Sequence, residues 1–522
     1  MKAWVKLLTL SIPMFISKNN LEVSVLPDSI LKKMPSIKSA FKIILCISIL
    51  ISNFNVYAQN QLKALQNAFD RKDTSMLTHT LSDRFSIAGF TDQSAKFCLQ
   101  QILNRHPVTQ IEAVEENSKR LIALFKDDKG KIDSSKIQLD ENGRIKQVEL
   151  FDRLYGVKRA QNPKLIAKIP FENKNGSILL KLTINGHQKP LKLLFDTGAD
   201  GMALNESVAN QLGLLANRTN SASVVGGTQQ IKVSEGNFVE IADLKLENMS
   251  IAIFPNRTDE SSDGIFGNAI LRRYITQIDY DKSEISLYEF GDFKYPGDGK
   301  LVPITFPSGV IHLKASLSVA GETAVPSDFI FDTGAGYSLI GFRPYVKKHK
   351  LLVSGFKSEV SSTTSSLGIV TPTFTGYAQT LRLGSLDAIS NFPISLMGGN
   401  SANKNWNPGA DGSIGVRAIS RYNHIINLVD GEIYMSPNKL HEYPQDFLIQ
   451  TYLFGWNNSG QLLLLDQIGA PDSDKKGKIV RAINGDLSAK IAKNEKLITK
   501  YKSTKDKSVL ITFEDQSNLT ID

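Results

Sequence analysis

The chain has 522 residues, of which 41% are hydrophobic and 22% charged, and its formal net charge is +9. This length fits about three or four domains, and the balanced composition is that of a globular protein without low-complexity blocks. The positive charge is spread thinly. The lysine-rich stretch 496–507 has Tyr501 as its one aromatic residue, so we interpret it as a solvated surface and expect no nucleic-acid partner.

Residues 1–58 are predicted to be a leader that ends in a secretory signal peptide. After Met34 come two lysines, an apolar run over 43–51 and the small residue Ala58. This is the order of a signal peptide, and the apolar run is too short for a convincing membrane span. We therefore expect export to the periplasm or outside of a bacterial cell, with no stable membrane span after cleavage and with Met1 or Met34 as the true start.

Residues 59–160 are predicted to form an α+β domain. Helical apolar spacing comes first, and strand-like runs follow, with a hairpin signal at Asn142-Gly143 between the last two. This order resembles the nuclear-transport-factor-like cone fold. We see no catalytic constellation here and expect an accessory or spacer domain. Cys98 is the one cysteine that remains after residue 58, so export does not depend on an internal disulfide.

The stretch from 160 to 437 is predicted to be almost entirely β and to contain an internal repeat. Each copy has a strand, a turn and a returning strand, followed downstream by an Asp-Gly motif with a further Gly three residues on. The elements are 177–184, Asn185-Gly186, 191–195 and 263–267 in the first copy, and 310–315, Ala320-Gly321, 329–331 and 411–415 in the second. We place the two predicted lobes at 165–295 and 296–437.

The pentapeptide Phe-Asp-Thr-Gly-Ala ends the returning strand of both copies, at 195–199 and at 331–335. At average residue usage the string Asp-Thr-Gly is expected roughly 0.1 times in a chain of this length. A single copy would be an ordinary turn, because Asp, Thr and Gly all suit turns. Two copies in matching places predict that Asp196 and Asp332 work together.

The chemistry of such a pair follows from its electrostatics. Two carboxyl groups that face each other across a pseudo-two-fold axis share one proton. The ionised member can deprotonate a water while the protonated member donates to a substrate carbonyl, with no metal, cofactor or covalent intermediate. Loop support is expected from four further residues, Thr197, Gly198, Thr333 and Gly334. Both aspartates lie on one chain, so a dimer is not required.

These motifs resemble the retropepsin/pepsin superfamily of aspartic peptidases, and the lobes, which are shorter than those of pepsin, look closer to bacterial retropepsin-like proteins. The resemblance covers about half of the chain and implies a bilobed pair of β-barrels that hydrolyses peptide or protein substrates. It also implies a Gly-containing flap hairpin over the cleft. The candidates are Gly226 and Gly227, with a weaker one at 366–368, and ordinary hairpin turns are an equal alternative.

The second lobe departs from the family pattern. Where lobe one has Ile265-Phe266-Gly267, lobe two has a polar residue, Ser413, before Ile-Gly. Asp200 and Gly336 stand where the family often has serine, and Asp200 could either raise the pKa of the pair or point outward. The alternative function is therefore a catalytically weak or inactive peptide-binding protein on the same scaffold.

Residues 447–522 resemble a PDZ domain. The strand and turn at 479–485 precede a predicted single helix over 487–501, and 453–455 is the candidate carboxylate-binding loop. PDZ domains bind peptides by adding a strand to a sheet edge, so a peptide ligand is expected. The alternative is a PDZ-like fold that serves only for packing.

Overall fold

The computed structural model describes residues 59–117, 120–225, 227–254, 262–321, 323–366, 369–399, 406–470, 474–503 and 508–522. The predicted leader, residues 1–58, and the flap candidate Gly226 lie outside these ranges. None of the helices within the described ranges is long and apolar enough to cross a bilayer.

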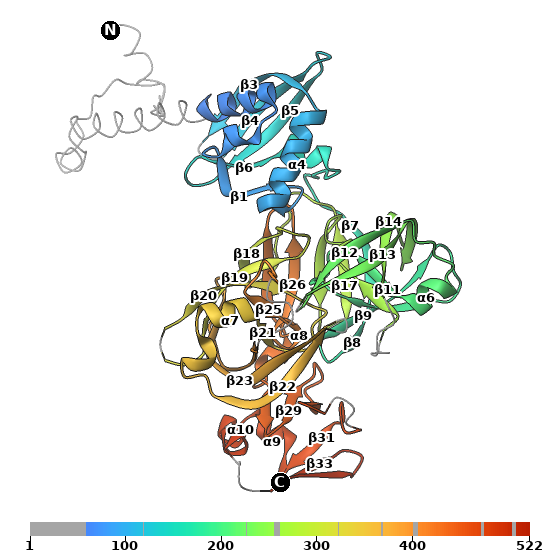
Figure 1. Cartoon of the computed structure of the whole chain (residues 1–522), viewed down its shortest axis with the longest axis vertical. Coiled ribbons are helices and arrows are strands. Elements are labelled where there is room, and N and C mark those ends of the chain that lie inside the picture. Colours follow the sequence, from blue (N-terminus) through green and yellow to red (C-terminus); the bar gives the residue numbers. More distant parts are fainter. Residues whose placement is uncertain are drawn as a thin grey trace, which may run out of the picture. The chain divides into compact units, whose positions relative to one another are not determined.

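The first part of the chain combines helices with a mixed sheet (Figure 1). Its elements are a helix over 59–71, η1 (Thr74–Leu77), β1 (Leu81–Ile87), β2 (Phe90–Thr91), α4 (Asp92–Arg105), β3 (Val108–Asn117), β4 (Arg120–Asp127), β5 (Ile132–Leu139), β6 (Ile145–Val148) and α5 (Glu149–Leu154). The sheet order is β2-β1-β6-β5-β4-β3. Phe125 on β4 packs on Phe151 of α5, which packs on Phe69 of the first helix. The likeness to the nuclear-transport-factor-like fold stays a prediction.

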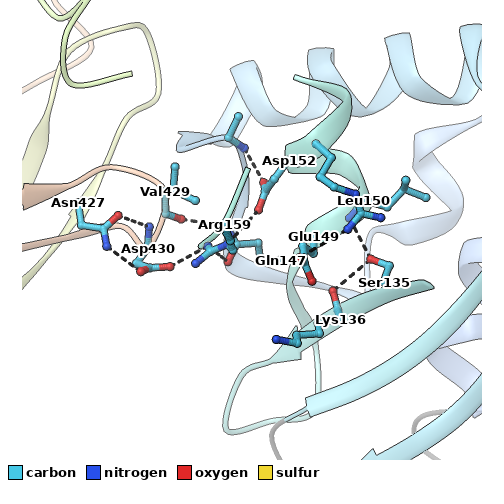
Figure 2. Close-up of polar contacts among 12 residues, drawn as sticks. Ser135, Lys136, Gln147, Glu149, Leu150, Asp152, Arg159, Asn427, Val429 and Asp430 are labelled. Carbon is cyan, nitrogen blue, oxygen red and sulfur yellow. Dashed lines mark hydrogen bonds and ion pairs between the residues drawn. The ribbon is translucent and has the colours of Figure 1, made fainter. Parts of the chain in front are cut away.

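An arginine joins this sheet to a turn of the second lobe. Arg159 Nη2 donates to Gln147 Oε1 at 2.9 Å and to Asp430 Oδ1 at 2.8 Å (Figure 2). The Asp152 side chain is fully buried beside Arg159; its Oδ1 accepts from the Ala88 N–H at 2.7 Å and its Oδ2 lies 3.9 Å from Arg159 Nε. The accessory part is therefore held by polar contacts as well as by its linker.

Lobe one is a sheet in the order β12-β13-β14-β11-β15-β10-β9-β8, with an additional pairing between β13 and β9. The elements of this region are β7 (Leu165–Pro170), β8 (Glu172–Lys174), β9 (Ser177–Ile184), β10 (Leu191–Phe195), β11 (Met202–Asn205), α6 (Glu206–Gln211), β12 (Arg218–Val224), β13 (Gly227–Ile241), β14 (Leu244–Phe254), β15 (Gly264–Phe266), β16 (Ile275–Asp279) and β17 (Glu284–Tyr288). The short β15 is parallel to β10 and antiparallel to β11. A side chain on Gly264 would meet the Ala203 carbonyl at 2.2 Å, so this insertion needs glycine.

Lobe two repeats that arrangement. Its elements are β18 (Lys300–Thr305), β19 (His312–Ser318), β20 (Val325–Phe331), β21 (Leu339–Gly341), α7 (Arg343–Lys348), η2 (Leu351–Val353), β22 (Ser358–Ser366), β23 (Ile369–Leu383), β24 (Ile389–Met397), β25 (Gly412–Ile414), α8 (Val416–Ile419), β26 (Tyr422–Asn427) and β27 (Glu432–Pro437). The order β22-β23-β24-β21-β25-β20-β19, with β23 also paired to β19, matches β12 through β9 strand for strand. The predicted mainly β, two-lobed fold class is confirmed.

A shared sheet holds the lobes together. From β19 the order continues as β18-β27-β26-β16-β17-β7, so strands from both lobes hydrogen-bond directly, with Thr276 of β16 paired to Ile426 of β26. Buried side chains of both lobes, among them Phe195 and Phe331, belong to one hydrophobic core. This common sheet and core fix where the ends of β10 and β20 meet.

The C-terminal part differs from its prediction in two places. Its elements are η3 (Lys439–Glu442), β28 (Phe447–Ile449), β29 (Tyr452–Trp456), β30 (Leu462–Gln467), β31 (Val480–Ile483), β32 (Asp486–Leu487), α9 (Ser488–Ala492), α10 (Glu495–Lys502), β33 (Val509–Phe513) and β34 (Asn518–Ile521). The helix predicted over 487–501 is two helices, because the Asn494 side chain accepts from the Lys496 N–H and starts a new one. The candidate loop 453–455 is instead the middle of β29, paired on both sides.

Candidate active site

The two Asp-Thr-Gly loops leave the sheet in the same way. The Asp196 N–H donates to the Phe266 carbonyl at 3.0 Å, and the Asp332 N–H donates to the Ile414 carbonyl at 3.0 Å. Each loop is therefore tied to the short strand inserted beside it, β15 or β25. Phe195 and Phe331, which directly precede the two aspartates, are fully buried, so the register of each strand is fixed and with it the position of each carboxyl.

The threonines cross-link the two loops. Thr197 Oγ1 donates to the Phe331 carbonyl at 2.5 Å and accepts from the Thr333 N–H at 3.0 Å. In the mirrored contact, Thr333 Oγ1 donates to the Phe195 carbonyl at 2.8 Å and accepts from the Thr197 N–H at 3.1 Å. Both threonines are fully buried. The predicted support role of this pair thus has a specific form: each hydroxyl bonds the backbone of the opposite lobe.

The structure brings the two carboxyl groups together. A Cβ atom on Gly198 would lie 2.6 Å from Asp332 Cγ, and one on Gly334 would lie 2.3 Å from Asp196 Cγ. Each carboxyl thus rests against the glycine of the opposite loop, and each also accepts from the glycine N–H of its own loop, at 2.8 Å for Asp196 and 3.0 Å for Asp332. The glycines are required here for close approach and not for an unusual backbone angle.

The carboxyls are electrostatically coupled. Burial raises the pKa of Asp332, and hydrogen bonds from Asp196, Ser413 and the loop backbone oppose that rise. Two carboxyl groups this close cannot both be ionised at low cost, so their approach favours one shared proton. This is the arrangement that general acid–base chemistry on a single water needs.

Asp200 does not add its charge to the pair. Its side chain is 61% exposed and forms an ion pair with Arg272, which also donates to the Asp200 carbonyl at 2.9 Å. The Arg272 guanidinium lies 5.6 Å from the ring centroids of both Phe90 and Phe306, and burial lowers the pKa of Arg272 to about 10. Of the two alternatives for Asp200, the structure shows the outward one.

The strands on either side of both flap candidates pair as hairpins, while Gly226 and residues 367–368 lie outside the described residues. In lobe one, Val224 pairs with Gly227 across the turn of β12 and β13; in lobe two, Ser366 pairs with Ile369 between β22 and β23. Val225, next to the turn of the first hairpin, packs against a cluster of lobe two made of Ile340, Phe342 and Met397. That contact reaches from one lobe to the other, as a flap would. The assignment of Gly226 and Gly227 as flap residues remains a prediction.

Two further polar residues support the loops: Asn268 was not found from the sequence, and Ser413 stood out there only as a departure from the family pattern. Asn268 Nδ2 donates to the Thr197 carbonyl at 3.0 Å and to the Gly309 carbonyl at 2.8 Å, and its side chain is fully buried. Ser413 Oγ donates to Asp332 Oδ2 at 3.1 Å. Both lie in the downstream Gly-containing motifs, where an alignment of the two copies would have shown a polar residue in one lobe against an apolar one in the other.

The site holds no evident metal ligands. Across the residues that the structure describes, no three His, Cys, Asp or Glu side chains are grouped so that they could hold a metal ion. The functional groups at the centre are the two carboxyls, the hydroxyl of Ser413 and backbone amides, which suffice for proton transfer through a bound water.

Comparison with known proteins supports the same region. Residues 180–270 match the family model described as aspartyl protease, a segment that contains Asp196 but not Asp332. Among solved structures, the chain is similar to a crystal structure of an aspartic proteinase from Irpex lacteus, at 14% identity and a TM-score of 0.33, over 52% of this chain and 97% of that chain. No curated protein matches the chain. The second half of the site therefore rests on the repeat of topology and on the contacts between the loops.

Proposed function

We propose that the chain is an aspartic endopeptidase that hydrolyses peptide bonds with a water activated between Asp196 and Asp332. The observation that carries the proposal is the approach of the two carboxyls, each of which lies against the glycine of the opposite loop. The aspartyl protease match over residues 180–270 supports the peptidase class independently of this geometry.

The reaction follows from the shared proton. The ionised carboxylate removes a proton from the water as its oxygen attacks the carbonyl carbon, and the protonated carboxyl donates to the developing oxyanion. The tetrahedral species then collapses, the C–N bond breaks, and the proton taken from the water is passed to the leaving nitrogen. The buried threonine cross-link keeps both loops fixed during these transfers, so little reorganisation is needed.

Export of the chain is part of the proposal. It is supported by the order of basic residues, apolar run and small residue that precedes Gln59 in the sequence. This leader, residues 1–58, lies outside the described residues. The location would be the periplasm or the extracellular medium of a bacterium. Fractionation of cells that express the full-length chain, with N-terminal sequencing of the mature product, tests it; a mature chain that keeps residues 34–58 would contradict it.

For the C-terminal part, we infer a packing role in place of a peptide receptor at the strand edge. β28 already pairs with the edge of β29 and contacts α10. The Leu448 N–H donates to the Tyr377 hydroxyl of lobe two at 2.7 Å, so the outer edge of β28 is also covered. Binding of a C-terminal peptide library to the full chain, lost when α10 is altered, would contradict this inference.

The enzyme proposal is tested by incubating the purified chain with a mixed peptide pool from acidic to neutral pH. Native protein should cleave internal peptide bonds, and Asp196→Asn or Asp332→Asn alone should abolish cleavage without loss of folding. Asp387→Asn, at a position 94% exposed, is the matched control and should leave cleavage unchanged. Peptide binding without turnover by the native protein would favour the inactive binding scaffold instead.

A further inference from the structure

We propose that Ser413 is a positioning residue that makes Asp332 the ionised member of the pair and leaves the proton on Asp196. This inference rests on the proposed peptidase function and deepens it, because it assigns the two chemical roles to particular carboxyls.

The contact of Ser413 with Asp332 is direct. Ser413 lies in the middle of β25, is 1% exposed, and donates from Oγ to Asp332 Oδ2 at 3.1 Å. The other carboxylate oxygen, Oδ1, accepts from the Gly334 N–H. A hydrogen bond donated to a carboxyl group stabilises its charged form, and it does so more strongly where water is excluded. Ser413 therefore favours a negative charge on Asp332.

Tyr337 lies beside this contact. Burial together with the nearby Asp332 carboxylate raises the pKa of Tyr337, so the phenol adds no negative charge next to Asp332. A serine hydroxyl has one proton to donate, and in the contact with Asp332 that proton goes to the carboxylate.

Lobe one lacks both hydroxyl groups at the matching positions. Ser413 is paired with Ile330 in the β20–β25 register, and Ile265 is paired with Leu194 in the corresponding β10–β15 register. The two positions are equivalent in register, so Ser413 and Ile265 differ only in the chemistry of their side chains. The isoleucine cannot donate a hydrogen bond.

The position of Tyr337 is also matched across the lobes. A Cβ atom on Gly415 would meet the Tyr337 carbonyl at 2.3 Å, and one on Gly267 would meet the Gly201 carbonyl at 2.4 Å. Gly201 therefore takes the place of Tyr337 in lobe one. The serine and tyrosine hydroxyl groups therefore both belong to lobe two.

The consequence is a fixed division of labour. Asp332 takes the proton of the attacking water, and Asp196 gives its own proton to the substrate carbonyl oxygen as the C–O bond forms. When the C–N bond breaks, Asp332 passes its proton to the leaving amine nitrogen and Asp196 recovers a proton from the tetrahedral hydroxyl. Protons balance over the cycle, and no further reactant is needed beyond water.

The test is the pH dependence of kcat/KM for native protein, Ser413→Ala, Ser413→Thr and Tyr337→Phe. Loss of a hydrogen bond to a charged group corresponds to about one pH unit, so the acid limb should move up by about one unit in Ser413→Ala. Tyr337→Phe keeps the serine donor and should leave the acid limb nearly in place, and Ser413→Thr should restore it.

A matched control lies in the same lobe. Ser327 also pairs its buried hydroxyl with a tyrosine, Tyr345, at 2.5 Å, but without contact to either carboxyl. Ser327→Ala should leave the acid limb in place. A Ser413→Ala profile that falls evenly at all pH values, with both limbs unmoved, would show that the serine only supports the fold and would overturn the inference.

A second readout separates this inference from the proposed function. Protein labelled with carboxyl-13C aspartate is titrated by NMR, and Asp332→Asn assigns the Asp332 resonance. The pKa of the Asp332 carboxyl should rise in Ser413→Ala relative to native protein. If native protein cleaves no peptide at any pH, the peptidase proposal fails; if the Asp332 titration is the same in both proteins, the positioning role of Ser413 fails.

Discussion

The two lobes have the same strand order and the same loop contacts, yet they differ in a few side chains around the carboxyls. The mirrored parts are the threonine cross-link and the glycines against which the carboxyls rest. The unlike parts are Asn268 against Val416 and Ser413 against Ile265. The comparison teaches that the repeat builds a symmetric frame, whereas single polar residues distinguish one half of the frame from the other.

The largest effect on peptide cleavage is expected at Gly198 and Gly334, the glycines that lie against the opposite carboxyl. Gly198→Ala and Gly334→Ala each place a methyl group closer than 3.0 Å to the opposite carboxyl, which must then move. Peptide cleavage should fall by at least about 100-fold in both variants, since a displacement of about 1 Å can cost that much. Steady-state kinetics on one cleaved peptide provide the measurement.

Controls for these variants lie in the same two loops. Gly201 and Gly336 have no heavy atom within 4 Å of an added Cβ and no positive backbone angle. Gly201→Ala and Gly336→Ala should therefore keep most of the activity. If their peptide cleavage falls as far as that of Gly198→Ala, the crowding argument is wrong.

The threonine cross-link should also behave symmetrically. Thr197→Val and Thr333→Val each leave a buried carbonyl and a buried N–H of the opposite lobe without their partner, at a cost of about 1–3 kcal/mol for each such group. The melting temperatures of both valine variants should fall by similar amounts. Those of Thr197→Ser and Thr333→Ser, which keep the hydroxyl, should fall much less. A large loss for one threonine and none for the other would break the symmetry.

Asn268 sharpens the comparison because its counterpart is apolar. Asn268→Val, which copies the lobe-two side chain, leaves the carbonyls of Thr197 and Gly309 without this donor. We expect a loss of about 1–3 kcal/mol in the free energy of unfolding, measured by denaturant titration. A variant as stable as native protein would contradict this role of Asn268.

The smallest expected effect concerns a buried carboxyl outside the lobes, which has no acidic partner in contact. Burial raises the pKa of Asp152 to about 7, whereas an aspartate in an unfolded chain titrates near about 4. Between these values the folded chain holds a proton that the unfolded chain has lost, so Asp152 lowers stability as the pH rises through this window.

Asp152→Asn removes that titration while it keeps an acceptor for the Ala88 N–H. The difference in melting temperature between the variant and native protein should therefore grow in favour of the variant from pH 5 to pH 8. A constant difference across this range would show that Asp152 is ionised throughout, paired with Arg159.

The sequence predicted the frame better than the details. Two copies of one pentapeptide after buried strands were enough for the paired lobes, because apolar runs and turn glycines are local signals. From the sequence, Ser413 reads as a departure that weakens the second half of the site. Its contact with Asp332 is not visible there, because the two residues are 81 positions apart in the chain. Asn268 gave no local signal for the same reason, and Asn494 was read as part of one helix although it caps a second.

The central claim is that both carboxyls hold one water, and a crystal structure of the native chain at a resolution that shows ordered water tests it most directly. We predict that the Asp196 and Asp332 carboxyls lie in hydrogen-bond contact and that a single water touches both, within about 3.2 Å of an oxygen of each. Carboxyls that lie apart, each turned into its own lobe with separate waters, would contradict the account.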